Sequence, residues 1–170
     1  AGYSAANRFT GWSMTKSVMN ALVGILVGEG RLRLEDNALH AEWQATDDLR
    51  RTITLNDLLQ MSSGLEFDES YTPSGGATRM LFASADAAAV AAESALRHRP
   101  GERFAYSSAT TNLISAVVRN TFDSDTAYQS FPRRALFERI GMESAVMEPD
   151  PSGTLVGSSF MYATARDWAR

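Results

Sequence analysis

Cysteine is absent from this 170-residue sequence, so disulfides, thiol catalysis and cysteine-ligated metal sites are excluded, while the cellular compartment stays open. Only two histidines are present, His40 and His98, and they lie far apart without other ligands at metal-binding spacing. No apolar run reaches the roughly 18 residues of a membrane span. The formal net charge is −4 and the basic residues are scattered, which argues against a nucleic-acid partner. We therefore expect no metal, no nucleic acid and no membrane partner.

The sequence does contain enough apolar residues for one compact domain, because 44% of its residues are hydrophobic and 21% are charged. Helical spacing of apolar residues dominates, and strand-like alternation is confined to short stretches. The predicted fold class is therefore mainly α. The expected elements are helices at 13–28, 35–43, 54–61, 84–96, 107–119 and 126–138, a helix starting at 164, an extended entry at 8–12 and an edge strand at 102–106.

Capping residues mark several of these boundaries. Thr54 and Asp57 have the spacing of a capping box at the start of a helix. Pro132 falls inside the 126–138 pattern, where it should kink the helix or begin a second piece. Gly141 is a candidate C-cap, and Thr164 is expected to cap the final helix.

The first predicted helix begins with a serine and a lysine three residues apart, Ser13 and Lys16. Side chains at this spacing share one face of a helix, and a nucleophilic serine needs a base within about 3 Å. Lysine can act as that base only when neutral, a form that the partial positive charge of a helix N-terminus favours. By itself the pattern is also typical of an N-cap followed by a solvated lysine. The apolar stripe that follows, including Val18, Leu22 and Ile25, predicts a buried helix that would hold the pair rigidly.

A polar loop follows the helix at 54–61 and contains Tyr71, Pro73, Gly75 and Gly76 among several acidic residues. Loops of this length inside compact domains are often lids or binding loops. One interpretation of Tyr71 is a lid residue that folds over a substrate, with the two glycines as a hinge. The other is an ordinary solvated acidic loop, and the sequence leaves both open.

Four motifs occur in an order that resembles the penicillin-recognising serine hydrolases, the serine β-lactamase family. The motifs are Ser13–Lys16, Leu55–Leu65, Pro100–Ser108 and Ala163–Asp167. The resemblance is to the branch that holds class C β-lactamases, D-alanyl-D-alanine carboxypeptidases and related esterases, and it is strongest to 6-aminohexanoate-dimer hydrolases. It implies the α/β serine β-lactamase/transpeptidase-like fold, of which this chain would supply the helical domain.

The resemblance also implies roles for individual residues. Ser13 resembles the acylated nucleophile, Lys16 its proton partner, and Tyr106 a second catalytic base whose phenolate a nearby ammonium would stabilise. The family commonly has an asparagine two residues after this tyrosine, where the present sequence has Ser108. A hydroxyl cannot donate and accept from two separate atoms as an amide does, so Ser108 is expected to bind substrate in a way that disfavours β-lactams. Tyr71 would be a second substrate-binding residue, and no cofactor is implied.

Two elements of the family are missing from residues 1–170: the Lys/His-Thr/x-Gly strand that supplies one oxyanion-hole amide, and the N-terminal strands of the main sheet. We therefore expect the helical part of one hydrolase domain, a fragment truncated at both ends that lacks most of the antiparallel sheet. Loss of one oxyanion donor typically costs about a hundredfold to a thousandfold in rate. The chain alone should be nearly inactive, and the surface that the sheet would cover should favour self-association.

The function that these patterns predict is hydrolysis of a small-molecule substrate, a linear amide or carboxylic ester such as a 6-aminohexanoate oligomer, through an acyl-enzyme on Ser13. Two alternatives stay open. One is a β-lactamase or D-alanyl-D-alanine carboxypeptidase. The other is a non-catalytic helical binding domain or a penicillin sensor.

Overall fold

The computed structural model describes residues 2–170, a stretch that contains eight α-helices and three short strands. The α-helices are α1 (Thr15–Gly28), α2 (Leu55–Leu59), α3 (Gly76–Phe82), α4 (Ala87–Ala92), α5 (Ser108–Arg119), α6 (Asp125–Pro132), α7 (Glu138–Ile140) and α8 (Ala165–Trp168). The remaining helical turns are the 3-10 helices η1 (Trp12–Met14), η2 (Ala41–Trp43) and η3 (Leu49–Thr52) and the π-helix η4 (Arg133–Phe137). The strands are β1 (Arg8–Thr10), β2 (Val146–Met147) and β3 (Met161–Thr164). The predicted fold class, mainly α with little sheet, is confirmed.

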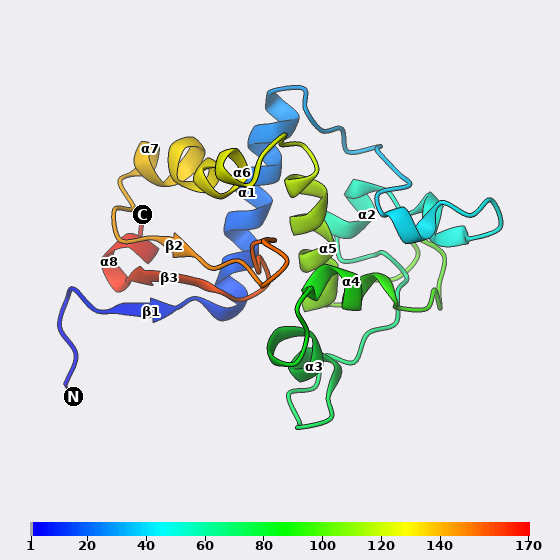
Figure 1. Ribbon diagram of the computed structural model, residues 1–170, viewed down its shortest axis with the longest axis horizontal. Coiled ribbons are helices and arrows are strands. Elements are labelled where there is room, and N and C mark those ends of the chain that lie inside the picture. Colours follow the sequence, from blue (N-terminus) through cyan, green and yellow to red (C-terminus); the bar gives the residue numbers. More distant parts are fainter. Residues whose placement is uncertain (1) are drawn as a thin grey trace.

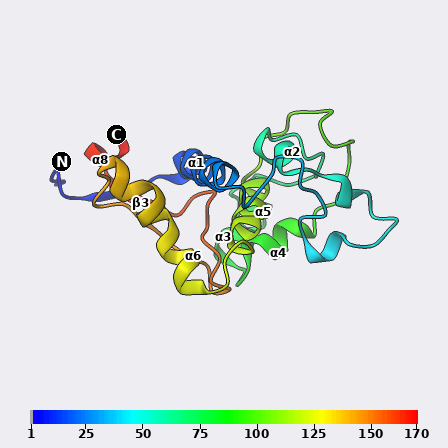
Figure 2. The same ribbon diagram turned by 90° about the horizontal axis from the view of Figure 1, so that it is seen from above.

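The long helix α1 stands between two groups of elements (Figure 1). The small sheet, α6, α7 and α8 lie on one side together with both chain ends, and α2, α3, α4 and α5 lie on the other, as the view from above also shows (Figure 2). Helix α5 contacts α1, α2, α3 and α4. It is therefore the element around which the second group is organised.

The sheet is antiparallel with the strand order β1-β3-β2, so the last strand in sequence lies in the middle. Phe9 of β1 lies opposite Ala163 of β3, and Val146 of β2 lies opposite Tyr162. Met161 and Ala163 are completely buried, whereas Tyr162 between them is only partly covered. This alternation is typical of a sheet with one face against a core.

The apolar stripe predicted for the first helix forms the centre of the core. Val18, Leu22 and Leu26 of α1 are buried, as are their neighbours Met19 and Val23. Burial of each such side chain contributes roughly 1.5–3 kcal/mol relative to an exposed one. Because Ser13 lies directly before this helix, the packing of α1 also fixes the position of the candidate nucleophile.

The predicted caps are confirmed. Thr54 and Asp57 form a reciprocal capping box at the start of α2, and Thr164 accepts a hydrogen bond from the Asp167 N–H at the start of α8. Gly141 ends α7 in the left-handed conformation with φ 71°. Pro132 ends α6, and the π-helix η4 follows it, because proline has no N–H to continue the regular pattern.

Three expectations from the sequence were wrong, and one helix was missed. Residues 35–40 are not helical, since Ala38 has φ 52°, and only the short η2 remains of the predicted helix at 35–43. The helix predicted at 84–96 shortens to α4, because Leu96 pairs with Leu65 instead. Residues 102–106 form no strand, and Phe104 within them is exposed. Helix α3 was not expected at all.

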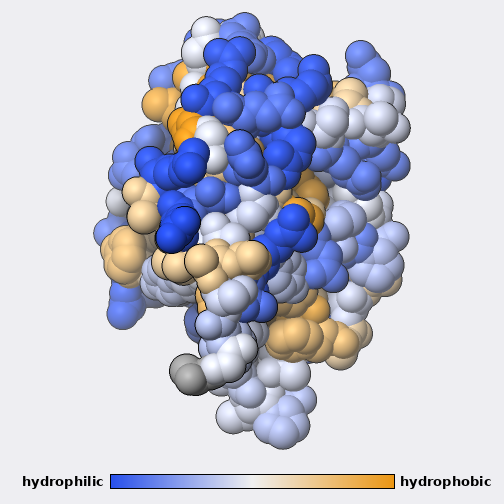
Figure 3. Space-filling view, turned by 90° about the vertical axis from the view of Figure 1, so that its left-hand side faces the viewer, coloured by the Kyte–Doolittle hydropathy of each residue, from blue (hydrophilic) through white to orange (hydrophobic). Residues whose placement is uncertain are grey.

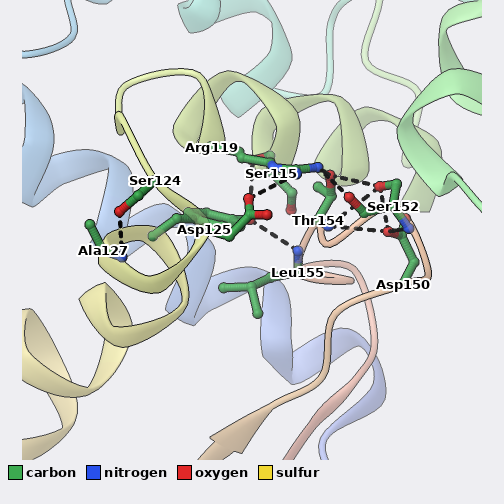
Figure 4. A network of polar contacts seen from close by, with 10 residues as sticks. Ser115, Arg119, Ser124, Asp125, Ala127, Asp150, Ser152, Thr154 and Leu155 are labelled. Atoms are coloured by element: carbon green, nitrogen blue, oxygen red, sulfur yellow. Dashed lines mark hydrogen bonds and ion pairs between the residues drawn. The ribbon is translucent and has the colours of Figure 1, made fainter.

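A polar network joins the end of α5, the start of α6 and the bend at 150–154 (Figure 4). Arg119, the last residue of α5, donates to the Ser152 carbonyl at 2.7 Å, to the Thr154 hydroxyl at 3.0 Å and to the Asp125 carboxylate at 2.9 Å. Asp150 accepts from the N–H groups of Ser152 and Thr154, at 3.0 and 3.1 Å. The network fixes the bend at 150–154, from which the chain returns toward the start of α1.

The face that carries the sheet exposes apolar side chains among polar ones (Figure 3). Phe9 of β1, Ile140 of α7 and Val146 of β2 are each 40–42% exposed. No helix within residues 2–170 combines the length and the apolar character that a membrane crossing requires.

Candidate active site

Ser13 lies in η1, the 3-10 turn that leads directly into α1, rather than in the first turn of the α-helix itself. Its neighbour Trp12 has φ 46°, a left-handed conformation that is rare for a residue with a large side chain. Such strain is found preferentially at functional sites, where the surrounding packing holds it. Ser13 is exposed, so an incoming molecule could reach its hydroxyl.

Lys16 is the centre of the hydrogen-bond arrangement at this site. Its ammonium nitrogen, Nζ, donates to Ser13 Oγ at 3.2 Å, to Ser108 Oγ at 3.1 Å and to the Ser158 carbonyl oxygen at 2.9 Å. The three acceptors come from η1, the start of α5 and the segment before β3. The structure therefore brings together residues that are 92 and 142 positions distant from Lys16 in the sequence.

Tyr106 lies close to Lys16 although the predicted edge strand does not form. The Lys16 Nζ is 5.1 Å from the centroid of the tyrosine ring, which is cation–π geometry. Tyr106 is 48% exposed, and it lines a cavity of about 210 Å³ together with Ser13 and Lys16. The three residues singled out as catalytic candidates therefore share one cavity.

Ser108 is completely buried and is the first residue of α5, directly after the N-cap Ser107. Its backbone N–H donates to Glu69 Oε2 at 2.8 Å, and its hydroxyl donates to Glu69 Oε1. Since Ser108 Oγ also accepts from Lys16, its hydrogen bonds lie inside the protein. From the sequence, Ser108 was expected to contact a substrate, whereas in the structure its hydroxyl and N–H contact Glu69 and Lys16.

Aromatic side chains form a wall beside Ser13. The Trp12 ring makes edge contacts with Tyr71, at 6.3 Å between centroids, and with Phe160, at 6.4 Å. Phe160 in turn lies 5.8 Å from Phe82 of α3. Tyr71 and Phe82 are more than half exposed, so the wall presents aromatic surface to a bound molecule next to Ser13.

The loop that carries Tyr71 is held in a defined turn. Asp68 accepts from the Ser70 N–H at 3.0 Å and from the Gly76 N–H at 3.0 Å, and these hydrogen bonds lower the pKa of the Asp68 carboxyl. A Cβ at Gly75 would lie 2.2 Å from the Ser70 carbonyl oxygen. Close backbone approach therefore explains the glycine at position 75, which the sequence had suggested as a hinge.

Three residues at the site carried no functional prediction from the sequence. They are Glu69, Asn112 and Ser158. The buried side-chain oxygen of Asn112 accepts from the Ser158 N–H at 3.2 Å. The one available signal was the position of Asn112 four residues after Ser108, on the same face of α5.

The two histidines lie apart from this arrangement. His40 is buried against Trp43, with 4.8 Å between ring centroids, and burial lowers its pKa. The side chain of His98 is close to that of Arg103. Within the part of the chain that the structure describes, no group of three or more histidine, aspartate or glutamate side chains has the geometry to hold a metal ion.

Solved structures share this fold along nearly the whole chain. A Bacillus anthracis protein described as a 6-aminohexanoate-dimer hydrolase aligns with a TM-score of 0.80 and 22% identity, over 99% of this chain and 47% of its own. A D-stereospecific amidohydrolase from Streptomyces sp. aligns with a TM-score of 0.72 and 18% identity, over 98% and 60%. A penicillin-binding protein from Bacillus halodurans aligns with a TM-score of 0.73 and 20% identity, over 98% and 59%.

The chain thus spans about half of the first of these proteins and about 60% of the other two. No curated protein matches it at a significant level. The family model for Beta-lactamase, however, matches residues 1–170. Because this family model covers the whole sequence, and because the mainly helical fold with its small sheet agrees with it, the chain belongs to the Beta-lactamase family.

Proposed function

We propose that the protein to which this chain belongs is a serine hydrolase that cleaves linear amide or carboxylic ester bonds through an acyl-enzyme on Ser13. The observation that carries the proposal is the contact of Lys16 Nζ with Ser13 Oγ at 3.2 Å, beside Tyr106 in a shared cavity. A serine hydroxyl becomes a useful nucleophile when groups at hydrogen-bond distance can take its proton. Both candidate partners of Ser13 lie in this cavity.

The reaction has two steps. In the first, Ser13 Oγ forms a bond to the substrate carbonyl carbon as its proton passes to the Lys16/Tyr106 pair, and the leaving amine or alcohol departs with a proton. In the second, a water molecule attacks the acyl group and releases the acid and free Ser13. Charge that develops on the carbonyl oxygen needs preorganised N–H donors, to which the backbone of the η1 turn would contribute.

The aromatic wall and the structural neighbours support the proposed substrate class. Trp12, Tyr71 and Phe160 offer apolar surface for a linear chain next to Ser13. Two similar proteins are described as a 6-aminohexanoate-dimer hydrolase and a D-stereospecific amidohydrolase, both of which names denote amide cleavage. Short amino-acid-like amides such as the 6-aminohexanoate dimer, and the corresponding esters, are the substrates that we propose.

The test uses the full-length protein with a chromogenic short-chain ester and the 6-aminohexanoate dimer. Ser13→Ala should lower kcat by about a thousandfold or more and abolish the acyl adduct on intact-protein mass spectrometry. Ser130→Ala is the matched control, because the Ser130 hydroxyl donates only to the Ala127 carbonyl within α6. Undiminished turnover by Ser13→Ala would refute the proposal.

A second candidate is a β-lactamase or D-alanyl-D-alanine carboxypeptidase, favoured by the similarity to a penicillin-binding protein. Ser108 argues against it, because its single oxygen is already shared between Glu69 and Lys16. Rapid labelling of Ser13 by fluorescent penicillin, followed by turnover, would favour this candidate. A persistent penicillin adduct without turnover would instead indicate a sensor that only binds.

For the isolated 170-residue chain we propose little or no activity. The chain spans only 47–60% of the similar proteins, so groups that their remaining parts contribute to the cleft would be absent. We also propose that its exposed apolar side chains, among them Phe9 and Val146, promote self-association. Ester hydrolysis by the purified chain at the rate of the full-length protein would contradict the first statement, and a monomer in sedimentation equilibrium would contradict the second.

A further inference from the structure

We infer that Glu69 is a positioning residue that acts through the Ser108 hydroxyl to keep Lys16 in the charged, donating form. This inference rests on the proposed function, and it concerns which group takes the proton of Ser13. If Lys16 donates to Ser13, it cannot accept that proton, which leaves Tyr106 as the other titratable group that lines the cavity.

The Glu69 carboxylate fixes the direction of the first hydrogen bond. A carboxylate only accepts, and both of its oxygens are occupied by Ser108: Oε2 by the N–H at 2.8 Å and Oε1 by the hydroxyl. The single hydroxyl proton of Ser108 therefore points at Glu69. What Ser108 Oγ offers to Lys16, at 3.1 Å, is a lone pair.

The other contacts of Lys16 have the same direction. The Ser158 carbonyl oxygen, 2.9 Å from Nζ, only accepts. Two N–H groups of Lys16 are thus committed to Ser108 and Ser158, and the third contact, to Ser13 Oγ at 3.2 Å, completes the three donors of an ammonium. A neutral amine would have only a lone pair left for Ser13.

Charge favours the ammonium. Glu69 is half-buried and forms no ion pair with an arginine or lysine among residues 2–170, whereas Glu66 in the same loop pairs with Arg97 at 2.6 Å. The Ser108 hydroxyl lies between the Glu69 carboxylate and Lys16, so each charge stabilises the other across one oxygen atom. Removing the charge of Glu69 would remove this electrostatic attraction.

The titratable groups that face this arrangement come from three elements. Lys16 belongs to α1, Tyr106 to the segment before α5, and Glu69 to the loop before α3. The segment before β3 contributes the uncharged carbonyl of Ser158. A change at Glu69 should therefore be transmitted to Lys16 first and to Tyr106 through Lys16.

The experiment compares pH profiles of kcat/KM for ester hydrolysis by the full-length protein and its Glu69→Gln variant. Glutamine has nearly the same shape and can still accept the Ser108 N–H, so the loop should stay in place. We expect kcat/KM to fall about tenfold near pH 7 and the alkaline limb to move to lower pH. Glu66→Gln is the matched control in the same loop and should leave the profile unchanged.

Three outcomes would overturn the inference. An unchanged profile in Glu69→Gln would remove any role of its charge. A uniform loss of activity with unmoved limbs would indicate only a structural role. An acid limb that moves to lower pH, with faster turnover near pH 7, would show that Lys16 works as a neutral base.

A second variant keeps the test valid if Glu69→Gln unfolds, which circular dichroism would reveal. Ser108→Ala removes the hydroxyl between Glu69 and Lys16 while keeping the backbone N–H contact, and it should move the alkaline limb in the same direction. The proposed function is tested separately by Ser13→Ala. If Ser13→Ala is inactive but the limbs do not move in either Glu69→Gln or Ser108→Ala, the inference about Glu69 fails and the hydrolase proposal stands.

Discussion

Replacing glycine by alanine should have opposite effects on stability at two positions, Gly157 and Gly24, because their surroundings differ. A Cβ added at Gly157 would lie 2.4 Å from both Met19 Cγ and Ser115 Oγ, so the Gly157→Ala variant must displace buried groups of α1 or α5. Overpacking of this kind costs about 1–3 kcal/mol. At Gly24, inside α1, nothing lies within 4 Å of an added Cβ. Gly24→Ala should therefore stabilise the protein by roughly 0.5–1 kcal/mol, because alanine loses less backbone entropy in a helix.

Urea unfolding of the two variants in the full-length protein measures this difference, which should be about 1.5–4 kcal/mol between them. Gly157→Ala should also lower kcat, because the next residue supplies the carbonyl that Lys16 contacts at 2.9 Å. Gly24→Ala should leave kcat unchanged. If Gly157→Ala is as stable as the wild type, the close packing of this segment against α1 and α5 is not as described.

Other predictions concern buried polar groups and pH. Tyr128→Phe should cost about 1–3 kcal/mol in thermal unfolding, because the buried Tyr128 hydroxyl accepts from the Leu155 N–H at 3.0 Å; Tyr162→Phe, which loses a hydrogen bond at the surface, should cost less. The Ser144 hydroxyl and N–H lower the pKa of Asp167, so this carboxylate stabilises the fold above about pH 4 and less as the pH falls through its lowered pKa. Asp167→Asn should therefore reduce the loss of stability between pH 7 and pH 3 in urea titrations, and an unaltered pH dependence would contradict this. 

Local signals in the sequence were sufficient to predict the helices whose formation depends on neighbouring residues. The capping box of Thr54 and Asp57 satisfies backbone donors within four residues, so its spacing alone predicts the start of α2. The stripe beginning at Val18 predicts α1 in the same way. The helix expected at 35–43 failed because nothing local reveals that Ala38 adopts a left-handed conformation.

The features that the sequence did not predict depend on contacts between residues that are distant in the sequence. The alternation at 102–106 resembles a strand, but the Ala105 N–H donates to the Met61 carbonyl at 2.7 Å and no partner strand is adjacent. Glu69 and Ser108 are 39 positions apart, and sequence spacing carries no information about their contact. Ser13 and Lys16 were paired by their spacing, but Tyr106 was placed beside them only by resemblance to a family, which supplied the long-range information that the residue pattern lacks.

One face of α5 connects the stability of the fold to the geometry of the site. The residues concerned are Ser108, Asn112, Ser115 and Arg119, whose spacing of three and four places them on one side of the helix. At the start of this face, the Ser108 hydroxyl accepts a hydrogen bond from Lys16. One turn later, the Asn112 side chain accepts from the Ser158 N–H, and the carbonyl of Ser158 accepts from Lys16. At the far end, Arg119 anchors the bend from which that segment returns. Two of the three acceptors around Lys16 are therefore positioned by a single helix, and a rotation of α5 would displace both together.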